Sequence, residues 1–111
     1  AAHPVPAQVL GYDCTFDMIC VERLSCQPSE LGVTVKPAPD KTATLATGGR
    51  VLEARTIVDP SLEARSFVTA LEFNSIHLLT IFQDGAARFT IHTPVQDLQS
   101  MTHFGRCEIA P

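Results

Sequence analysis

Two short turn signals, Gly48-Gly49 and Asp84-Gly85, indicate that much of this chain is folded into antiparallel hairpins. Both dipeptides favour the tight turns whose twist matches that of the flanking strands. Strand-like segments lie on both sides of each turn, at 42–47 and 50–58 and at 76–82 and 87–93. The sequence therefore predicts two hairpins between neighbouring strands.

Strand patterning continues through the rest of the chain. Apolar and polar residues alternate over 11–21, and β-branched residues dominate 31–36. We expect a last strand over 101–109. A chain of 111 residues fits a single domain, which we place at 11–111, after an extended, proline-containing arm at 1–10. We expect an all-β fold, a small antiparallel up-and-down barrel or sandwich of about eight strands closed by disulfides.

The segment at about 60–72 is compatible with two structures. Ala64, Phe67, Val68 and Leu71 have helical spacing after Asp59-Pro60, a reasonable helix start. Phe67, Thr69, Leu71 and Phe73 also alternate, as in a strand. We predict a strand over about 65–71 and keep one helix at about 60–72 as the alternative.

The hairpin registers predict which side chains are buried. Around Gly48-Gly49, Leu45 faces Leu52, which leaves one face apolar and the other polar. A two-residue loop at Asp84-Gly85 places Leu78, Thr80 and Phe82 on the same face as Ala87, Phe89 and Ile91. The predicted core is Phe16, Leu45, Leu52, Leu78, Phe82, Phe89 and Ile91, together with Val33 or Val35.

The four cysteines permit three disulfide connectivities. We predict Cys20–Cys26, which closes a short local loop, and Cys14–Cys107, which joins the first and last strands if the sheet closes. A cysteine zinc site and reduced, buried thiols are the alternatives. The cysteine spacings do not match the close pairs typical of structural zinc sites.

Composition and missing motifs narrow the functional classes. The net charge is −4, and the basic residues do not interleave with aromatic ones, so we expect no nucleic-acid binding. No apolar run approaches the roughly 18 residues of a membrane-spanning helix. Signatures such as G-x-S-x-G, H-E-x-x-H and the phosphate loop are absent, so we expect no enzyme. The small residues of Ala1-Ala2-His3-Pro4 predict a mature exported protein, periplasmic or secreted.

The histidines suggest a metal site as an alternative function. A two-residue loop at Asp84-Gly85 places His77 directly opposite His92, with Cβ atoms about 4.5–5.5 Å apart. Met101 and His103 share one face of the last strand, a thioether and imidazole pair suited to copper. The expected cofactor is none, with copper or zinc at His77, His92, His103 and Met101 as the alternative.

The two ends of the chain carry a family resemblance. Tyr12-Asp13-Cys14 and Phe104-Gly105-Arg106-Cys107-Glu108 frame a predicted eight-stranded barrel, which resembles the membrane-bound C-type lysozyme inhibitor family, whose two cysteines tie the terminal strands. That family's S-G-x-x-Y segment and later lysine have no counterpart here. Asn74-Ser75-Ile76 is the nearest piece, and no lysine follows Lys41. The resemblance therefore transfers no inhibitory residue.

A second resemblance concerns the C-terminal half. The run L-L-T-I-x-x-D-G-A-A, followed by F-G-x-C-E, is similar to small exported bacterial proteins of unknown function. Taken together, the sequence predicts a non-enzymatic binding or inhibitor module of the bacterial envelope whose partner is another protein. A periplasmic copper- or zinc-handling protein is the alternative.

Overall fold

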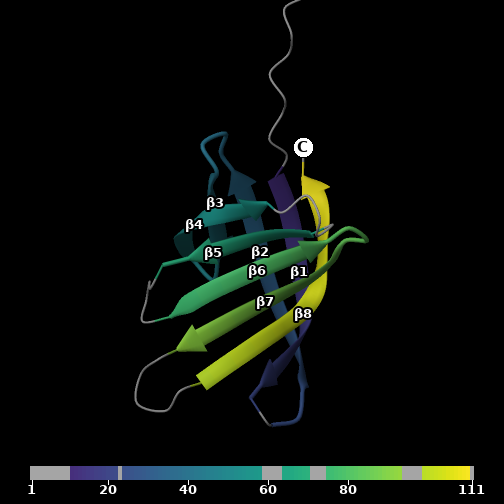
Figure 1. Cartoon of the computed structure of the whole chain (residues 1–111). Helices are drawn as coiled ribbons and strands as arrows, with labels where there is room; N and C mark the ends of the chain where they lie inside the picture. Colours follow the sequence, from purple (N-terminus) through teal and green to yellow (C-terminus); the bar gives the residue numbers. More distant parts are fainter. Residues whose placement is uncertain (1–10, 23, 59–63, 71–74, 94–98, 111) are drawn as a thin grey trace, which may run out of the picture.

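The protein is a closed antiparallel barrel of eight strands, each paired with its neighbour in sequence and the last paired with the first (Figure 1). The computed structural model describes residues 11–22, 24–58, 64–70, 75–93 and 99–110. The strands are β1 (Gly11–Val21), β2 (Gln27–Pro37), β3 (Thr42–Thr47), β4 (Arg50–Val58), β5 (Ala64–Thr69), β6 (Ile76–Phe82), β7 (Ala86–Thr93) and β8 (Gln99–Ala110). The predicted all-β class is confirmed, and of the two architectures the structure is the barrel.

The two predicted disulfides are both present. Cys14 lies directly opposite Cys107 where β1 pairs with β8, and the bond between them joins residues 93 apart in the sequence. Cys20–Cys26 links the end of β1 to the segment just before β2. On the chain-entropy model, the longer loop contributes roughly 4 kcal/mol by restricting the unfolded chain. The pairing of β1 with β8 closes the barrel, and we call it the seam. The first disulfide thus joins the two strands of the seam.

Beside a bulge in β1, the backbones of β1 and β8 approach each other closely. The pairing with β8 shifts between Phe16 and Met18, and Phe16 faces Gly105. A Cβ atom at Gly105 would overlap the carbonyl oxygen of Thr15 and lie 2.6 Å from the Cα atom of Phe16. Gly105 is therefore required by the close approach of two backbones.

The first hairpin has the predicted register. Leu45 pairs with Leu52 and Ala43 with Ala54, and all four are buried. Gly48 and Gly49 have φ values of 55° and 76°. Positive φ at both central residues is what this two-residue turn requires, and glycine adopts it without a steric cost.

The second hairpin differs from the prediction by one residue. Ile76 pairs with His92 and Ile81 with Ala87, so three residues, Gln83-Asp84-Gly85, form the loop. The N–H of Gly85 donates to the carbonyl of Phe82 (2.9 Å), and Gly85 has a φ of 90°. Asp84 accepts a hydrogen bond from the Ala86 N–H (2.9 Å). A positive-φ third loop residue produces a bulged hairpin, and a one-residue shift reverses both faces of β6.

The buried set follows this corrected register. Phe16, Leu45, Leu52, Phe89, Val33 and Val35 are buried as predicted. The prediction is wrong for Leu78 and Phe82, which are each 39% exposed, and Ile91 is only partly buried. Leu79, Ile81 and Phe67 are buried instead, and the Phe16 and Phe89 rings lie 5.9 Å apart inside the barrel. Large side chains therefore occupy the interior.

Two further predictions can be compared with the structure, and a third cannot. Ala64–Thr69 is strand β5, so the helix alternative at about 60–72 is wrong within the part of that segment the structure describes. Strand β2 begins at Gln27, earlier than the predicted 31, because it continues the pairing with β1 to Ile19. The predicted arm at 1–10 lies outside the described residues.

Candidate functional site on the outer face of β5 to β8

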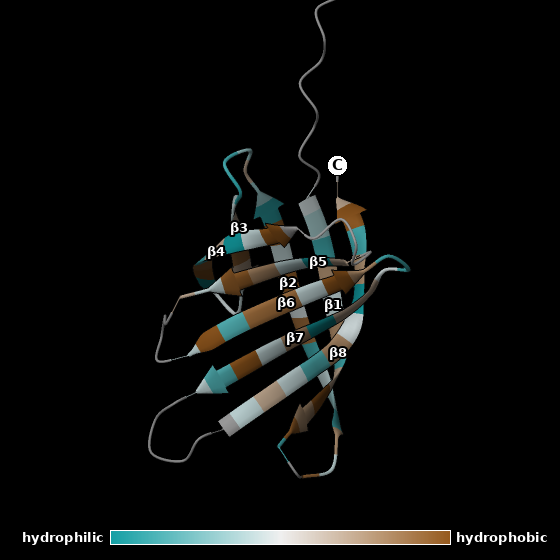
Figure 2. Ribbon diagram, viewed as in Figure 1, coloured by the Kyte–Doolittle hydropathy of each residue, from teal (hydrophilic) through white to brown (hydrophobic). Residues whose placement is uncertain are grey.

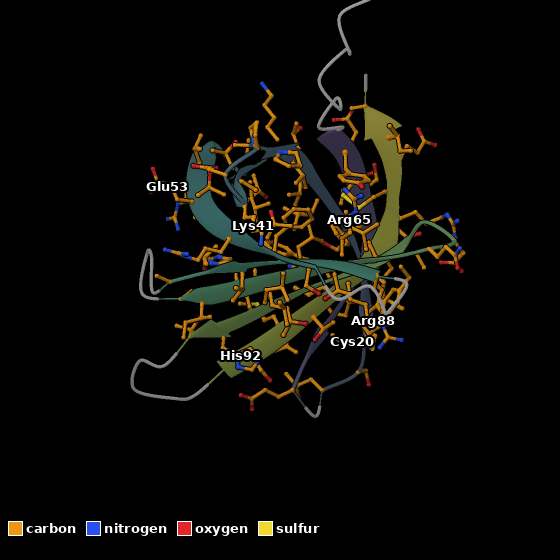
Figure 3. The ribbon with its side chains drawn as sticks, turned by 45° about the horizontal axis from the view of Figure 1, so that its top comes forward. Cys20, Lys41, Glu53, Arg65, Arg88 and His92 are labelled. Carbon is orange, nitrogen blue, oxygen red and sulfur yellow. A yellow bond between two sulfur atoms is a disulfide. The ribbon has the colours of Figure 1, made fainter. Side chains whose placement is uncertain are left out.

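The predicted histidine pair does not form. His77 pairs with Ile91 and faces the barrel interior, where it is buried, whereas His92 pairs with Ile76 and is exposed. The two imidazoles thus lie on opposite faces of the sheet, because the loop contains one residue more than predicted. Figure 3 shows His92 outside the barrel wall.

His77 and His103 belong to the core. They come from the strands on either side of β7, and both rings contact Phe89, at centroid distances of 5.7 Å and 6.1 Å. Thr69 Oγ1 accepts a hydrogen bond from the His77 backbone N–H (3.0 Å) and lies 3.4 Å from its Nδ1. Burial lowers the pKa of His103, whose buried Nδ1 has no hydrogen-bond partner among the described residues. Neutral His103 therefore packs as an aromatic side chain.

This arrangement does not bring the four predicted metal ligands together. Met101 pairs with Ile91 and His103 with Phe89, so the two predicted β8 ligands do lie beside the β6–β7 hairpin. Phe89 nevertheless contacts both interior histidine rings, and His92 is outside. Within the described ranges, no group of three or more His, Cys, Asp or Glu side chains is placed to hold a metal ion.

The outer surface of β5 to β8 carries several exposed apolar side chains. Leu78 is paired with Val68, and both point outward, as do Ile76 and Phe82. We call the outward side chains Val68, Ile76, Leu78, Phe82 and Phe104 the apolar face. Figure 2 shows extended hydrophobic colouring along β6, which lies in the middle of this surface. Contiguous exposed apolar side chains are typical of interaction sites.

Hydroxyl groups occupy much of the space between these apolar side chains. Ser66 and Thr80 form a hydrogen bond across β5 and β6 (2.9 Å), and the Thr90 and Thr102 hydroxyls lie 3.5 Å apart across β7 and β8. Glu108 is the single acidic residue in the described strands β5 to β8, and it pairs with Asp13 at the far end of the seam. This part of the surface therefore has few charges and no central carboxylate.

A groove of about 730 Å³ opens at the hairpin end of the apolar face. Phe82, Arg88 and Phe104 line it, together with the small residues Ala64, Ala86, Ala87 and Gly105 and the loop residues Gln83 and Asp84. The guanidinium carbon of Arg88 lies 5.7 Å from the centroid of the Phe82 ring and 5.4 Å from that of Phe104. Two aromatic rings thus hold an exposed cation.

Sequence reasoning missed this site because it assigned Leu78 and Phe82 to the interior. The alternation along 76–82 is ambiguous, since Ile76, Leu78, Leu79, Ile81 and Phe82 are all apolar. The polar ring of His77 on this strand favoured the wrong choice, because it lies on the buried face. A signal was present in the three-residue loop ending in glycine, which is the second most common hairpin connection.

Comparisons with known proteins add no assignment. No protein-family model, curated protein or solved structure matches the chain. No helix in the described part of the chain is long and apolar enough to cross a membrane.

Proposed function

We propose that this chain is an exported, non-enzymatic module of the bacterial envelope that acts by binding another protein. The observation that carries the proposal is the apolar face, with Leu78 and Phe82 each 39% exposed and Ile76 43% exposed on one strand. Burying such side chains against a partner stabilises a complex by about 25 cal/mol per Å² of apolar surface, before the costs of association.

The rest of the barrel is consistent with a scaffold for this surface. Phe16, Phe67 and Phe89 are fully buried, so large side chains occupy the space in which a hollow barrel of this size would hold a small ligand. The buried Thr69 and His77 hydrogen-bond to each other inside the barrel and are not presented to a substrate. Two disulfides are in keeping with an oxidising compartment.

The test is site-specific photo-crosslinking in the envelope of the source bacterium. A photoreactive amino acid replaces Leu78 on the apolar face or, as the matched control, Val51, which is 63% exposed on the outside of β4. We expect a discrete protein adduct from position 78 and none from position 51. Equal labelling at both positions, or no adduct at position 78, would refute the proposal.

Inhibition is one form that this binding could take. A panel of lysozymes assayed with the purified chain tests that form directly, and Leu78→Glu provides the control because it places a charge on the apolar face without touching the interior. Inhibition that Leu78→Glu abolishes would identify the module as an inhibitor that uses this face.

A further inference from the structure

The groove around Arg88 indicates what kind of partner the apolar face accepts. Arg88 is exposed, and no carboxylate of the described residues pairs with it. The neighbouring Arg106 differs, because it donates a hydrogen bond to the Asp84 carbonyl (2.6 Å). Among the described residues, the guanidinium donors of Arg88 are therefore left for an incoming group.

The two phenylalanines give this cation a defined position. Phe82 on β6 and Phe104 on β8 stand on either side of β7, which carries Arg88, and both rings lie within 6 Å of the guanidinium carbon. Such packing restricts the side chain and removes water from the faces of the guanidinium group while its edge stays free. A planar fork held in this way is suited to two parallel hydrogen bonds with one carboxylate.

The surroundings add an apolar requirement. The small alanine side chains, and Gly105 with no side chain, leave a groove of about 730 Å³ between the rings and the loop. A carboxylate alone would use Arg88 but would leave this apolar space exposed to water. We infer that the groove binds a protein segment presenting an Asp or Glu carboxylate next to an apolar side chain, with the carboxylate on Arg88 and the apolar side chain beside Phe82 and Phe104. This inference rests on the proposed binding function.

Charge complementarity favours such a partner over a basic one. The described residues 64–70, 75–93 and 99–110 contain three arginines and two acidic residues, although the whole chain has a net charge of −4. Of the two acidic residues, Asp84 lines the groove and accepts a hydrogen bond from the Ala86 N–H, and Glu108 lies outside the groove. An acidic segment is therefore attracted to this surface in particular. An isolated exposed ion pair contributes little, so affinity requires the apolar contact as well.

The experiment uses selection from a displayed random heptapeptide library against the intact chain. We expect enriched peptides to carry Asp or Glu beside an aromatic or aliphatic residue. Binding of a labelled enriched peptide is then measured by fluorescence polarisation with Arg88→Gln, Arg88→Lys and Arg55→Gln. Arg55 is the matched control because it is an exposed arginine on β4 that does not line the groove around Arg88.

Arg88→Gln should weaken binding about tenfold or more, equivalent to about 1.4 kcal/mol. Arg88→Lys should weaken binding less, since it keeps the charge and loses the fork, and Arg55→Gln should have no effect. Replacing the peptide's acidic residue by its amide should reproduce the Arg88→Gln loss in the wild-type chain and add nothing in the variant. Circular dichroism confirms that each variant is folded.

Three results would overturn the inference. They are the enrichment of apolar peptides without an acid, equal binding by Arg88→Gln and Arg55→Gln, and the absence of any enriched peptide. A dimer seen by sedimentation velocity, lost in Leu78→Glu and kept in Arg88→Gln, would also overturn it by assigning the face to a second copy of the chain. The crosslink at position 78 tests the proposed function separately, because it requires contact with a protein but no carboxylate.

Discussion

The two halves of the barrel differ in the polarity of their interiors. In β1 to β4 the described buried residues are apolar, including Phe16, Val35, Leu45 and Leu52. In β5 to β8 the buried set includes Thr69, His77 and His103, while Leu78 and Phe82 are exposed. The first half contains four acidic residues in its described strands and the second contains one.

Exposed apolar side chains occur in both halves, since Val51 and Ile57 on β4 are more exposed than Leu78 and Phe82. The buried polar side chains are what separates the second half from the first. An antiparallel sheet with one solvated face normally turns its polar residues outward. Asp40 follows this pattern beside β3, where hydrogen bonds from Thr42 lower the pKa of its carboxyl group. Exposed apolar residues on β6 and buried imidazoles behind them do not serve stability in this simple way. We therefore connect the second half, and not the first, with the proposed binding function.

The largest expected effect comes from comparing Phe82 and Phe89, which the sequence analysis assigned to the same core. Phe89 is buried in contact with Phe16, His77 and His103, so Phe89→Ala should cost about 3–5 kcal/mol of unfolding free energy. Phe82→Ala removes a ring that is 39% exposed and should cost about 1 kcal/mol or less. Urea denaturation of both variants measures the difference. Equal costs would place Phe82 in the core and remove the apolar face.

A second test compares one glycine from each half. Gly105→Ala inserts a Cβ atom into the backbone of β1, so we expect a loss of about 3 kcal/mol as the seam is forced apart. Gly32→Ala on β2 meets nothing within 4 Å and should change stability by about 0.5 kcal/mol or less. Thermal denaturation with the disulfides intact measures both effects. Tolerance of alanine at position 105 would contradict the close approach of β1 and β8.

The interior histidine of the second half predicts a dependence of stability on pH. Burial lowers the pKa of His103 below its ordinary value of 6.5 in the folded chain. The unfolded chain then binds more protons, so the contribution of neutral His103 is complete above pH 6.5 and declines as the pH falls towards the folded pKa.

His103→Leu removes this titrating group, and the decline in unfolding free energy below pH 6.5 should become shallower. His92→Gln, which replaces an exposed imidazole, is the control and should keep the wild-type slope. Urea denaturation at a series of pH values gives both profiles. Identical slopes for His103→Leu and the wild type would mean that His103 is hydrated in the folded protein.

The smallest expected effect concerns the apolar face itself. Leu78→Thr shortens an exposed side chain at a strand position where threonine is well accepted, so stability should change by about 0.5 kcal/mol or less. The same variant should reduce partner capture, measured by crosslinking from the neighbouring position 76. A large loss of stability would show that Leu78 serves the fold and would weaken the proposed role of the face.

The sequence by itself determined the strand content, the first hairpin and the disulfides. Alternation and turn residues are local signals, and Gly48-Gly49 permits one register with a consistent apolar side. The position of Cys14 and Cys107 on the first and last strands was enough to predict their bond, because antiparallel closure brings those strands together.

Only the tertiary structure decided which face of β6 is inside. Five of the seven residues in Ile76–Phe82 are apolar, so either face of this strand could be buried. The outcome depends on one additional loop residue, Gln83, in the loop that ends at the positive-φ Gly85, and the shift reverses every side chain on the strand. The Arg88 groove could not be predicted for the same physical reason: it requires Phe82 and Phe104, 22 residues apart in the sequence, to stand outside on either side of β7.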